Sequence, residues 1–331
     1  MTLWRLLRRM FIRLRGAFAP TPPLPPPAAN PLRPGHPPNT TVNAGQRVAW
    51  RRSSVARARV RGRGGQVGSG GQGTIHEIPG RPDAVMKRFS APIPGAVSGF
   101  RQVMVRGDSV RNAIGTTRVQ LCWPEEVEAS GSELRGYVMP RIQSEFYFDV
   151  KGRARERSLD WAVSVQKAFV IPFSVTGQDR LELVRLISRW LKSMHDHNLV
   201  YGDLSWKNVA FSVSPEIRVS IFDFDSTRLI GAPSFTGHGA LHTIDWTDPA
   251  AVDGPPTLDS DRYRFAALAF RLLVSKDLRA SIDPETVPRS LPGLHDTDVQ
   301  RLTRLWRRAC GPSGTRPTLV EWCSALDVPV N

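Results

Sequence analysis

Cysteine is scarce in this sequence, and the three that are present exclude two kinds of site. Cys122, Cys310 and Cys323 are far apart and odd in number, so they do not make a disulfide framework. None of them has a second cysteine or a histidine at metal-ligand spacing. Buried free thiols are the expected state, which fits a reducing compartment and predicts a cytoplasmic location.

Acidic residues are missing from the N-terminal region, where no Asp or Glu precedes Glu77. Residues 1–63 carry thirteen arginines and no lysine. Without these thirteen positive charges, the net charge of +15 falls to about +2 for the rest of the chain. The folded part is therefore nearly neutral, and its charge gives no reason to expect nucleic-acid binding.

Long hydrophobic runs are also absent, since none approaches the roughly 20 residues that a membrane-spanning helix needs. Residues 1–18 instead place apolar side chains at three- and four-residue steps, with arginines between them. On a helix this pattern gives an apolar face bordered by guanidinium groups, which suits peripheral contact with an anionic membrane surface. A helix docked on the folded domain or on a partner protein is the alternative.

Residues 19–63 are rich in proline and arginine, with six prolines between positions 20 and 27. Such a stretch favours extended conformations and cannot build a core, so we predict a disordered linker. The composition changes after Arg63. The remaining chain is long enough for one domain of about 250 residues.

Glycines follow the linker directly. Gly68, Gly70 and Gly73 fit the pattern G-x-G-x-x-G, with Ile75 at the next hydrophobic position. Glycine is needed where a hairpin tip must approach phosphate groups closely, because a Cβ would collide there. We predict that the whole loop contacts a nucleotide, through Gly68, Ser69, Gly70, Gly71, Gln72 and Gly73.

A lysine ends the next predicted strand. Ala84-Val85-Met86-Lys87 matches V-A-I-K, fourteen residues after the last glycine of the loop. In that motif the lysine ammonium contacts the nucleotide phosphates. A dinucleotide-binding fold would place a helix directly after the glycines, whereas residues 74–78 alternate like a strand. A Walker P-loop is excluded, because no Gly-Lys-Ser/Thr ends the run.

Two acidic motifs lie further along the chain. Asp203 and Asn208 have the D-x-x-x-x-N spacing of a kinase catalytic loop, and they follow a segment, 181–197, with helical apolar periodicity. The Asp would accept the proton of a substrate hydroxyl, and the Asn would hold a metal ion. After a strand-like run, the tripeptide 223–225 (Asp-Phe-Asp) reads as D-F-G with its glycine replaced, and Asp223 would hold Mg²⁺.

With these motifs in this order, residues 64–328 resemble the protein kinase superfamily, and most closely its divergent bacterial eukaryotic-like serine/threonine kinases. Residues 136–142 look like the fifth strand and the hinge. Asp261 looks like the buried Asp that ties down the catalytic-loop backbone, and residues 316–318 resemble the Arg-Pro-Thr motif near the C-terminus.

The resemblance implies an α+β, two-lobed protein-kinase-like fold with a β-rich N-lobe (64–142) and a helical C-lobe (143–331). ATP would bind between the lobes together with Mg²⁺ or Mn²⁺. The catalytic residues would then be Asp203 and Lys87, and the metal ligands Asn208 and Asp223. Beyond the glycine loop and Lys87, the resemblance implies nucleotide contacts from Ile75, Val85, Met139 and Arg141.

Several positions depart from the family pattern. Tyr201-Gly202 replaces His-Arg, so no arginine stands there to read a phosphorylated activation loop, in which Thr236 and Thr243 would lie. Ser205 stands where protein-serine/threonine kinases usually carry lysine, which weakens the expectation of a protein substrate.

Two usual glutamates are also missing. Residues 92–116 contain no Glu to pair with Lys87, and Asp108 is the best replacement, one methylene shorter. Arg316 lacks its usual Glu partner, and Asp248 could serve instead. The basic stretch 151–157 is predicted as a solvated loop, with a lid or a docking surface as the alternatives.

Three functions remain open. The favoured one is an ATP-dependent phosphotransferase, a protein serine/threonine kinase whose protein substrate the sequence does not name. A pseudokinase that binds nucleotide or a partner protein is the second, because the helix Glu and the D-F-G glycine are missing. The third is a small-molecule kinase of the antibiotic- or choline-phosphotransferase type, since those families also tend to lack the arginine before the catalytic Asp.

Overall fold

The computed structural model describes residues 65–70, 72–163, 172–232, 245–246, 248–249 and 254–328, which belong to one unit spanning Ala58–Asn331. The segments predicted as amphipathic helix (1–18) and linker (19–63) lie outside the described residues, as do Gly71, Thr236 and Thr243. Among the described helices, none combines the length and apolarity that crossing a bilayer requires.

The N-terminal part of this unit is a five-stranded sheet in the order β1-β2-β3-β6-β5, with every neighbouring pair antiparallel. Its strands are β1 (Gln66–Gly70), β2 (Gly73–Ile78), β3 (Arg81–Ile93), β5 (Glu126–Ser130) and β6 (Glu133–Pro140). The register sets Lys87 of β3 opposite Tyr137 of β6. Side chains directly opposite each other project from the same face, so these two are neighbours on the sheet.

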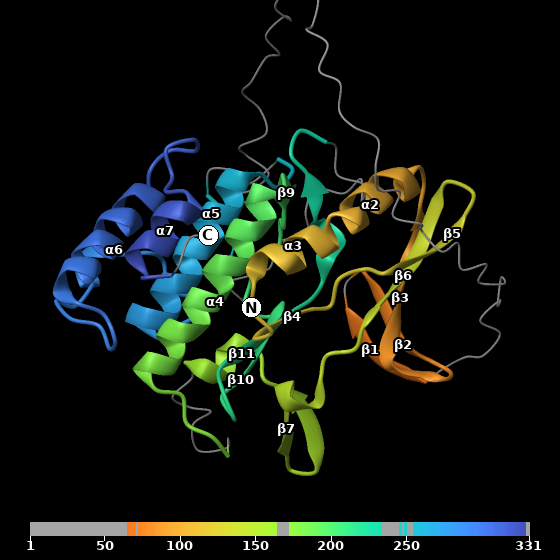
Figure 1. The fold of residues 1–331 in the computed structure, drawn as a ribbon, viewed down its shortest axis with the longest axis horizontal. Coiled ribbons are helices and arrows are strands. Elements are labelled where there is room, and N and C mark those ends of the chain that lie inside the picture. The colour runs from red at the N-terminus through yellow and green to blue at the C-terminus, as the bar shows by residue number, and fades with distance from the viewer. Residues whose placement is uncertain are drawn as a thin grey trace, which may run out of the picture. The chain divides into compact units, whose positions relative to one another are not determined.

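Two helices follow β3, namely α2 (Ala96–Val105) and α3 (Gly107–Ile114), and Figure 1 shows them between the sheet and α4 (Gly177–Asp196). Helix α2 packs on the sheet, where Phe100 is fully buried with its ring centroid 5.2 Å from that of Tyr137. Helix α3 contacts α4 instead, since the Ser193 hydroxyl donates a hydrogen bond to the carbonyl of Val110 at 3.0 Å.

The C-terminal part is helical, with α4, α5 (Leu258–Phe270), η5 (Arg271–Ser275), η6 (Pro284–Thr286), α6 (Asp296–Ala309) and α7 (Leu319–Ala325). Three of these helices begin at a threonine that accepts a hydrogen bond from the third residue of the helix: Thr176, Thr257 and Thr318. Such reciprocal capping satisfies amide groups that would otherwise lack partners, which explains where the helices start. Figure 1 shows α4 and α5 beside each other.

Short strands connect the helices and carry the loops of the site. They are β4 (Val119–Leu121), β9 (Leu199–Val200), β10 (Val209–Ser212), β11 (Arg218–Ile221) and β12 (Arg228–Leu229), with the turn η4 (Phe224–Ser226) between the last two. Strand β4 pairs in parallel with β11, and β9 pairs with β12. The β9–β10 loop carries Asp203 and Asn208, and the segment after β11 carries Asp223.

The basic stretch at 151–157 is largely exposed, as the sequence predicts, but it is mostly a strand and not a loop. A hairpin of β7 (Tyr147–Val150) and β8 (Arg153–Glu156) lies between the turns η1 (Ser144–Phe146) and η2 (Leu159–Ala162). It is anchored by apolar contact, since Phe148 packs edge-on against Trp161 with ring centroids 4.8 Å apart. The basic side chains of the stretch stay largely in solvent, while this aromatic contact holds the hairpin against the domain.

The described part of the chain is thus mixed α+β, with a sheet in its N-terminal region and helices in its C-terminal region. This arrangement is compatible with the kinase-like fold that the resemblance implies. One large apolar core surrounds α4 and α5, and a smaller one surrounds Phe100 and Tyr137 beneath the sheet. Both cores contribute to the candidate site, the larger through Tyr201 and Phe224 and the smaller through Tyr137 and Val85.

Candidate active site

A cavity of about 600 Å³ lies beside the β1–β2 hairpin and the segment after β6. Its volume is that of a small-molecule site. Six residues predicted to contact a nucleotide line it: Gly68, Ser69, Ile75, Val85, Met139 and Arg141. The remaining wall is formed by residues that the sequence prediction does not include: Val67, Pro140, Ile142, Ser144, Tyr147, Ala154, Glu156 and Phe222.

Two residues of the β7–β8 hairpin give the cavity an ionisable wall. Tyr147 and Glu156 are paired across the hairpin, and both line the cavity. Burial raises the pKa of Glu156 to about 7 and the pKa of Tyr147 to about 12. A carboxyl group that takes up a proton near neutral pH therefore lines the cavity.

Gly73 is required by strand packing. A Cβ at this position would lie 2.0 Å from the carbonyl oxygen of Arg88, so only glycine lets β2 approach β3 here. The contact of Gly73 with phosphate stays a prediction, as do those of Gly70 and Gln72, which lie at the hairpin tip outside the cavity lining.

Lys87, on the central strand β3 of the sheet, lies between two carboxylates. Its Nζ is 2.7 Å from Oδ1 of Asp223 and 2.5 Å from Oδ2 of Asp225, and the residue is only 7% exposed. Burial acts to lower the pKa of Lys87, but the attraction of Asp225 and Asp223 outweighs it and holds the pKa well above its ordinary value. The ammonium is therefore charged and fixed.

Asp225 is the more deeply buried of the two carboxylates, at 1% exposure. The hydroxyl of Tyr137 donates a hydrogen bond to its Oδ1 at 2.6 Å, so both oxygens of the carboxylate have a partner. Burial raises the pKa of Asp225 to about 6, against the opposing effect of Lys87. Sequence reasoning missed this contact, although an Asp in place of the D-F-G glycine was its visible sign.

The predicted partner of Lys87 on the helix side is wrong. Asp108 stands in the first turn of α3 with its side chain 85% exposed, and it pairs with Arg111 at 2.7 Å. Burying this solvated carboxylate beside Lys87 would cost desolvation energy, and its exposed pair with Arg111 avoids that cost. The carboxylate that Lys87 needs comes instead from the segment after β11.

Asp203 is held at both carboxylate oxygens. The guanidinium of Arg264 lies 3.0 Å from Oδ1, and the amide of Asn208 donates to Oδ2 at 2.9 Å. Burial raises the pKa of Asp203 to about 6, although the charge of Arg264 acts to lower it. Sequence reasoning missed the contact of Arg264 with Asp203. Ser205, at the position that usually holds a lysine in the resembled family, is fully buried.

The backbone before Asp203 is fixed by Asp261 of α5, as the resemblance predicts. The amides of Tyr201 and Gly202 donate to its two carboxylate oxygens at 2.8 Å and 2.9 Å. Asp261 is fully buried, and His195 of α4 lies 3.4 Å from it. The loop that presents Asp203 is therefore attached to a core helix.

Local contacts explain why Tyr201 and Gly202 stand where the resembled family usually has His-Arg. The Tyr201 hydroxyl donates to the carbonyl of Phe222 at 2.5 Å, which links the loop of Asp203 to the segment of Asp223. Gly202 has a φ of +85°, and a Cβ there would lie 2.8 Å from the carbonyl oxygen of Ser226. Any larger residue, arginine included, is strained at this position.

Asp223 follows β11 in a left-handed conformation, with φ of 61°. This rare backbone state is maintained by its neighbour Phe224, which is fully buried against the rings of Trp123 and Tyr201, at 4.6 Å and 5.5 Å between centroids. The amide of Phe222 donates to the carbonyl of Asn208 at 3.2 Å, so the two predicted metal ligands come from directly linked segments.

The donor set suits a hard cation. In the described part of the chain, no three or more His, Cys, Asp and Glu side chains form a metal-binding group. Asp223 and Asn208 offer a carboxylate and an amide oxygen, which are the ligands Mg²⁺ accepts together with phosphate oxygens and water. These two residues therefore fit a metal ion that arrives with a nucleotide.

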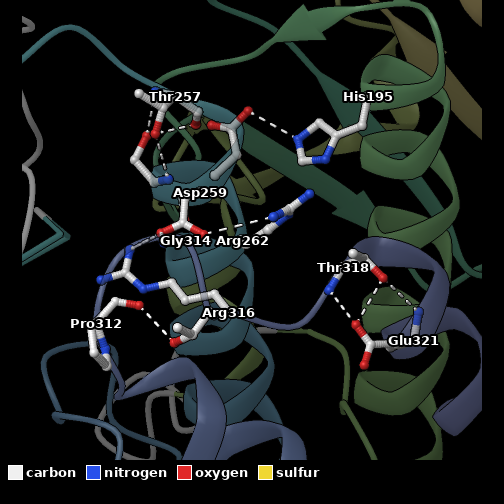
Figure 2. A network of polar contacts seen from close by, with 12 residues as sticks. His195, Thr257, Asp259, Arg262, Pro312, Gly314, Arg316, Thr318 and Glu321 are labelled. Atoms are coloured by element: carbon white, nitrogen blue, oxygen red, sulfur yellow. Dashed lines mark hydrogen bonds and ion pairs between the residues drawn. The ribbon is translucent and has the colours of Figure 1, made fainter.

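A second predicted pair lies beneath the site. Arg316 pairs through both terminal nitrogens with the buried carboxylate of Asp248, as expected from the sequence. It also lies 3.3 Å from Asp259 of α5, which accepts a hydrogen bond from the amide of Gly314 at 3.0 Å (Figure 2). This network attaches the segment before α7 to the helix that carries Asp261 and Arg264.

Comparison with known proteins finds distant relatives. The chain is 21% identical over 319 residues to the protein kinase YegI of Escherichia coli O157:H7, in an alignment covering 80% of this chain and 44% of that protein. The corresponding protein of strain K12 is 21% identical over 318 residues, with the same coverage. The chain thus spans less than half the length of these relatives. No family model matches it. This likeness suggests a kinase-like phosphotransferase.

Proposed function

We propose that this chain is an ATP- and Mg²⁺-dependent phosphotransferase that moves the γ-phosphate of ATP to a hydroxyl group, most suitably a serine or threonine of a protein. The observation that carries the proposal is the ion pair between Lys87 of the sheet and Asp223 of the helical part, at 2.7 Å. It brings the lysine expected to hold phosphates to the carboxylate expected to hold their metal ion.

The cavity beside this pair is where the purine would bind. Ile75 and Val85 supply apolar surface from the sheet, and Phe222 supplies it from the helical part. The amide of Arg141 donates to the carbonyl of Asp83 at 2.8 Å, and its carbonyl accepts from Gln120 at 2.9 Å. Both backbone groups of Arg141 therefore already have partners within the protein, and a base would meet the residues beside it.

The phosphates would extend from this cavity toward Lys87. The glycine hairpin covers them, and the Lys87 ammonium contacts them directly. Asn208 and Asp223 would hold Mg²⁺, which neutralises the charge that develops on the phosphate oxygens. Fixed charges in a site that excludes water stabilise such a transition state without reorganisation.

Asp203 would be the proton acceptor. The substrate oxygen forms a bond to the γ-phosphorus while the bond from that phosphorus to the bridging oxygen of ADP breaks, and the hydroxyl proton passes to Asp203. With a pKa of about 6, Asp203 is ionised at neutral pH yet basic enough to take the proton. Arg264 and Asn208 orient its two oxygens.

Two contacts support an active enzyme over a pseudokinase or a small-molecule kinase. The missing helix Glu favours inactivity only if Lys87 has no carboxylate, and Asp225 provides one at 2.5 Å. The missing lysine at Ser205 weakens the assignment of a protein substrate only if no cation reaches Asp203, and Arg264 reaches it at 3.0 Å. Both charges that the family pattern requires are therefore present, from other positions.

The test is incorporation of γ-labelled phosphate by the full chain with Mg²⁺ or Mn²⁺, using a basic protein, autophosphorylation and small hydroxyl compounds as acceptors. We expect a labelled protein that is lost in both Asp203→Ala and Asp223→Ala. If only a small hydroxyl compound is labelled, the chain is a small-molecule kinase and the assignment as a protein kinase is wrong. Nucleotide binding without labelling of any acceptor would favour a pseudokinase.

A further inference from the structure

The partner of the Lys87 ammonium is the feature that departs furthest from the resembled family. Helix α2, which would carry the glutamate in that family, has no acidic residue. Where it meets the sheet it presents the ring of Phe100, packed 5.2 Å from the ring of Tyr137. This face of α2 is apolar and fully used in the smaller core.

The geometry points to Asp225 as the positioning residue of Lys87, supplied by the Asp-Phe-Asp segment in place of the helix. It is built for that role at three points. Its Oδ2 lies 2.5 Å from the ammonium, its Oδ1 accepts from Tyr137 at 2.6 Å, and the side chain is 1% exposed. The inference rests on the proposed function, because it concerns how Lys87 meets the phosphates.

The need for a second carboxylate follows from the position of Asp223. Lys87 contacts both Asp223 and Asp225, and the side chain of Asp223 is 38% exposed toward the site whereas that of Asp225 is buried. When Asp223 serves a metal ion, Asp225 remains with the ammonium. If Asp225 were neutral, Asp223 would be the remaining carboxylate of the two beside Lys87. Lys87 would then compete with the metal ion for Asp223, and Asp223 would compete with the phosphates for Lys87.

Tyr137 fixes Asp225 from the sheet side. Its hydroxyl stands directly across the β3–β6 ladder from Lys87, so the ammonium and the hydroxyl approach the same carboxylate from neighbouring positions. Contacts at both oxygens hold the Asp225 carboxylate in one rotamer, which in turn fixes the position of the Lys87 ammonium. The orientation of Lys87 is thereby set by β6 and the segment after β11, with no polar contribution from α2.

The first experiment compares phosphate transfer by Asp225→Asn, Asp225→Gly and the matched control Asp108→Asn. Asn keeps the shape and the hydrogen bond to Tyr137 but removes the charge, while Gly restores the family residue. We expect kcat to fall about 10- to 100-fold in both variants with a smaller change in the KM for ATP, because a misplacement of about 1 Å costs up to ~10²-fold. Asp108→Asn should behave as wild type.

Three results would overturn the inference. They are an Asp225→Asn enzyme with wild-type kcat, an Asp225→Gly enzyme that is faster than wild type, and an Asp108→Asn enzyme that is as impaired as Asp225→Asn. Tyr137→Phe provides a milder variant that keeps the charge. It should lower kcat several-fold in the same direction, and it should lower Tm while unfolding stays cooperative, because Oδ1 of the buried Asp225 loses its donor.

A second measurement does not depend on turnover. The affinity for a non-hydrolysable ATP analogue with Mg²⁺ is measured for Lys87→Ala, Asp225→Asn and the double variant. If Asp225 acts through Lys87, the double variant should differ by about threefold or more from the product of the single effects, because contacting residues couple. The Lys87/Asp108 cycle should be multiplicative, and a multiplicative Lys87/Asp225 cycle would overturn the inference. An inactive wild type that shows this coupling would refute the proposed function alone.

Discussion

The guanidinium of Arg264 lies 3.0 Å from Oδ1 of Asp203, while the amide of Asn208 donates to Oδ2 of the same carboxylate. Arg264 is 1% exposed and belongs to α5, the helix that also carries Asp261. One helix therefore fixes both the backbone before Asp203 and the orientation of its side chain. In the resembled family a lysine usually stands at the position of Ser205, whereas here the positive charge beside Asp203 comes from α5.

Replacing Arg264 should impair transfer more than binding. We expect Arg264→Met to lower kcat about 10- to 100-fold, because a hydrogen bond to a charged group contributes about 1.5–3 kcal/mol. Arg264→Lys should recover part of the loss. The matched control is Arg262→Met on the same helix, whose guanidinium is 3.7 Å from Asp259, and it should retain activity. Equal losses in the two methionine variants would contradict the assignment.

The activity should depend on pH through Asp203. Burial raises its pKa to about 6, so the carboxylate that we propose as proton acceptor is lost as the pH falls through 6 rather than through 4. We expect kcat/KM to fall tenfold for each unit of pH below this value. A pH profile between 5 and 8 measures it, and in Arg264→Met the acid limb should move to higher pH, because Arg264 acts to lower that pKa. A profile that is flat to pH 5 would contradict this role.

Gly202 should not tolerate a side chain. We expect Gly202→Ala to lower the free energy of unfolding by about 1–3 kcal/mol or more, through backbone strain and contact with Ser226 and Pro256. Gly131→Ala is the control, since its φ is +60° but a Cβ there meets nothing within 4 Å. Denaturant unfolding of both variants separates crowding from strain, and equal losses would show that the close contacts carry no cost.

The buried pair beneath the site should be far more costly to break than an exposed one. Asp248→Asn leaves the Arg316 guanidinium buried with reduced compensation, and such a change costs about 3–5 kcal/mol. Glu285→Gln breaks the exposed pair with Arg307 at 3.0 Å and should cost less than about 1 kcal/mol. Thermal unfolding of the two variants measures the difference, and a similar Tm for both would refute it.

The sequence predicts those parts of the site that are written in short contiguous patterns. Lys87, Asp203 and Asn208 each stand in a motif of a few residues whose spacing reflects one strand or one loop. The contacts of Asp261 and of Arg316 with Asp248 follow from the resemblance, because they concern positions that the family pattern already pairs.

The contacts that the sequence does not predict join distant parts of the chain. Arg264 and Asp203 are 61 residues apart, and Lys87 and Asp223 are 136 apart. No periodicity connects such positions, and a missing helix glutamate draws attention to nearby acids such as Asp108. One local sign did point to the Lys87–Asp225 contact, namely the Asp at the position of the D-F-G glycine. A charged residue in a buried turn is unfavourable unless a partner stands beside it.

The placement of Phe224 between Trp123 and Tyr201 makes the position of the Lys87 ammonium depend on one aromatic cluster. Phe224 separates the two carboxylates that contact Lys87, and all three residues share one short turn. A displacement of this ring would therefore move Asp223 and Asp225 together, so the two ion pairs of Lys87 would form or break as one unit.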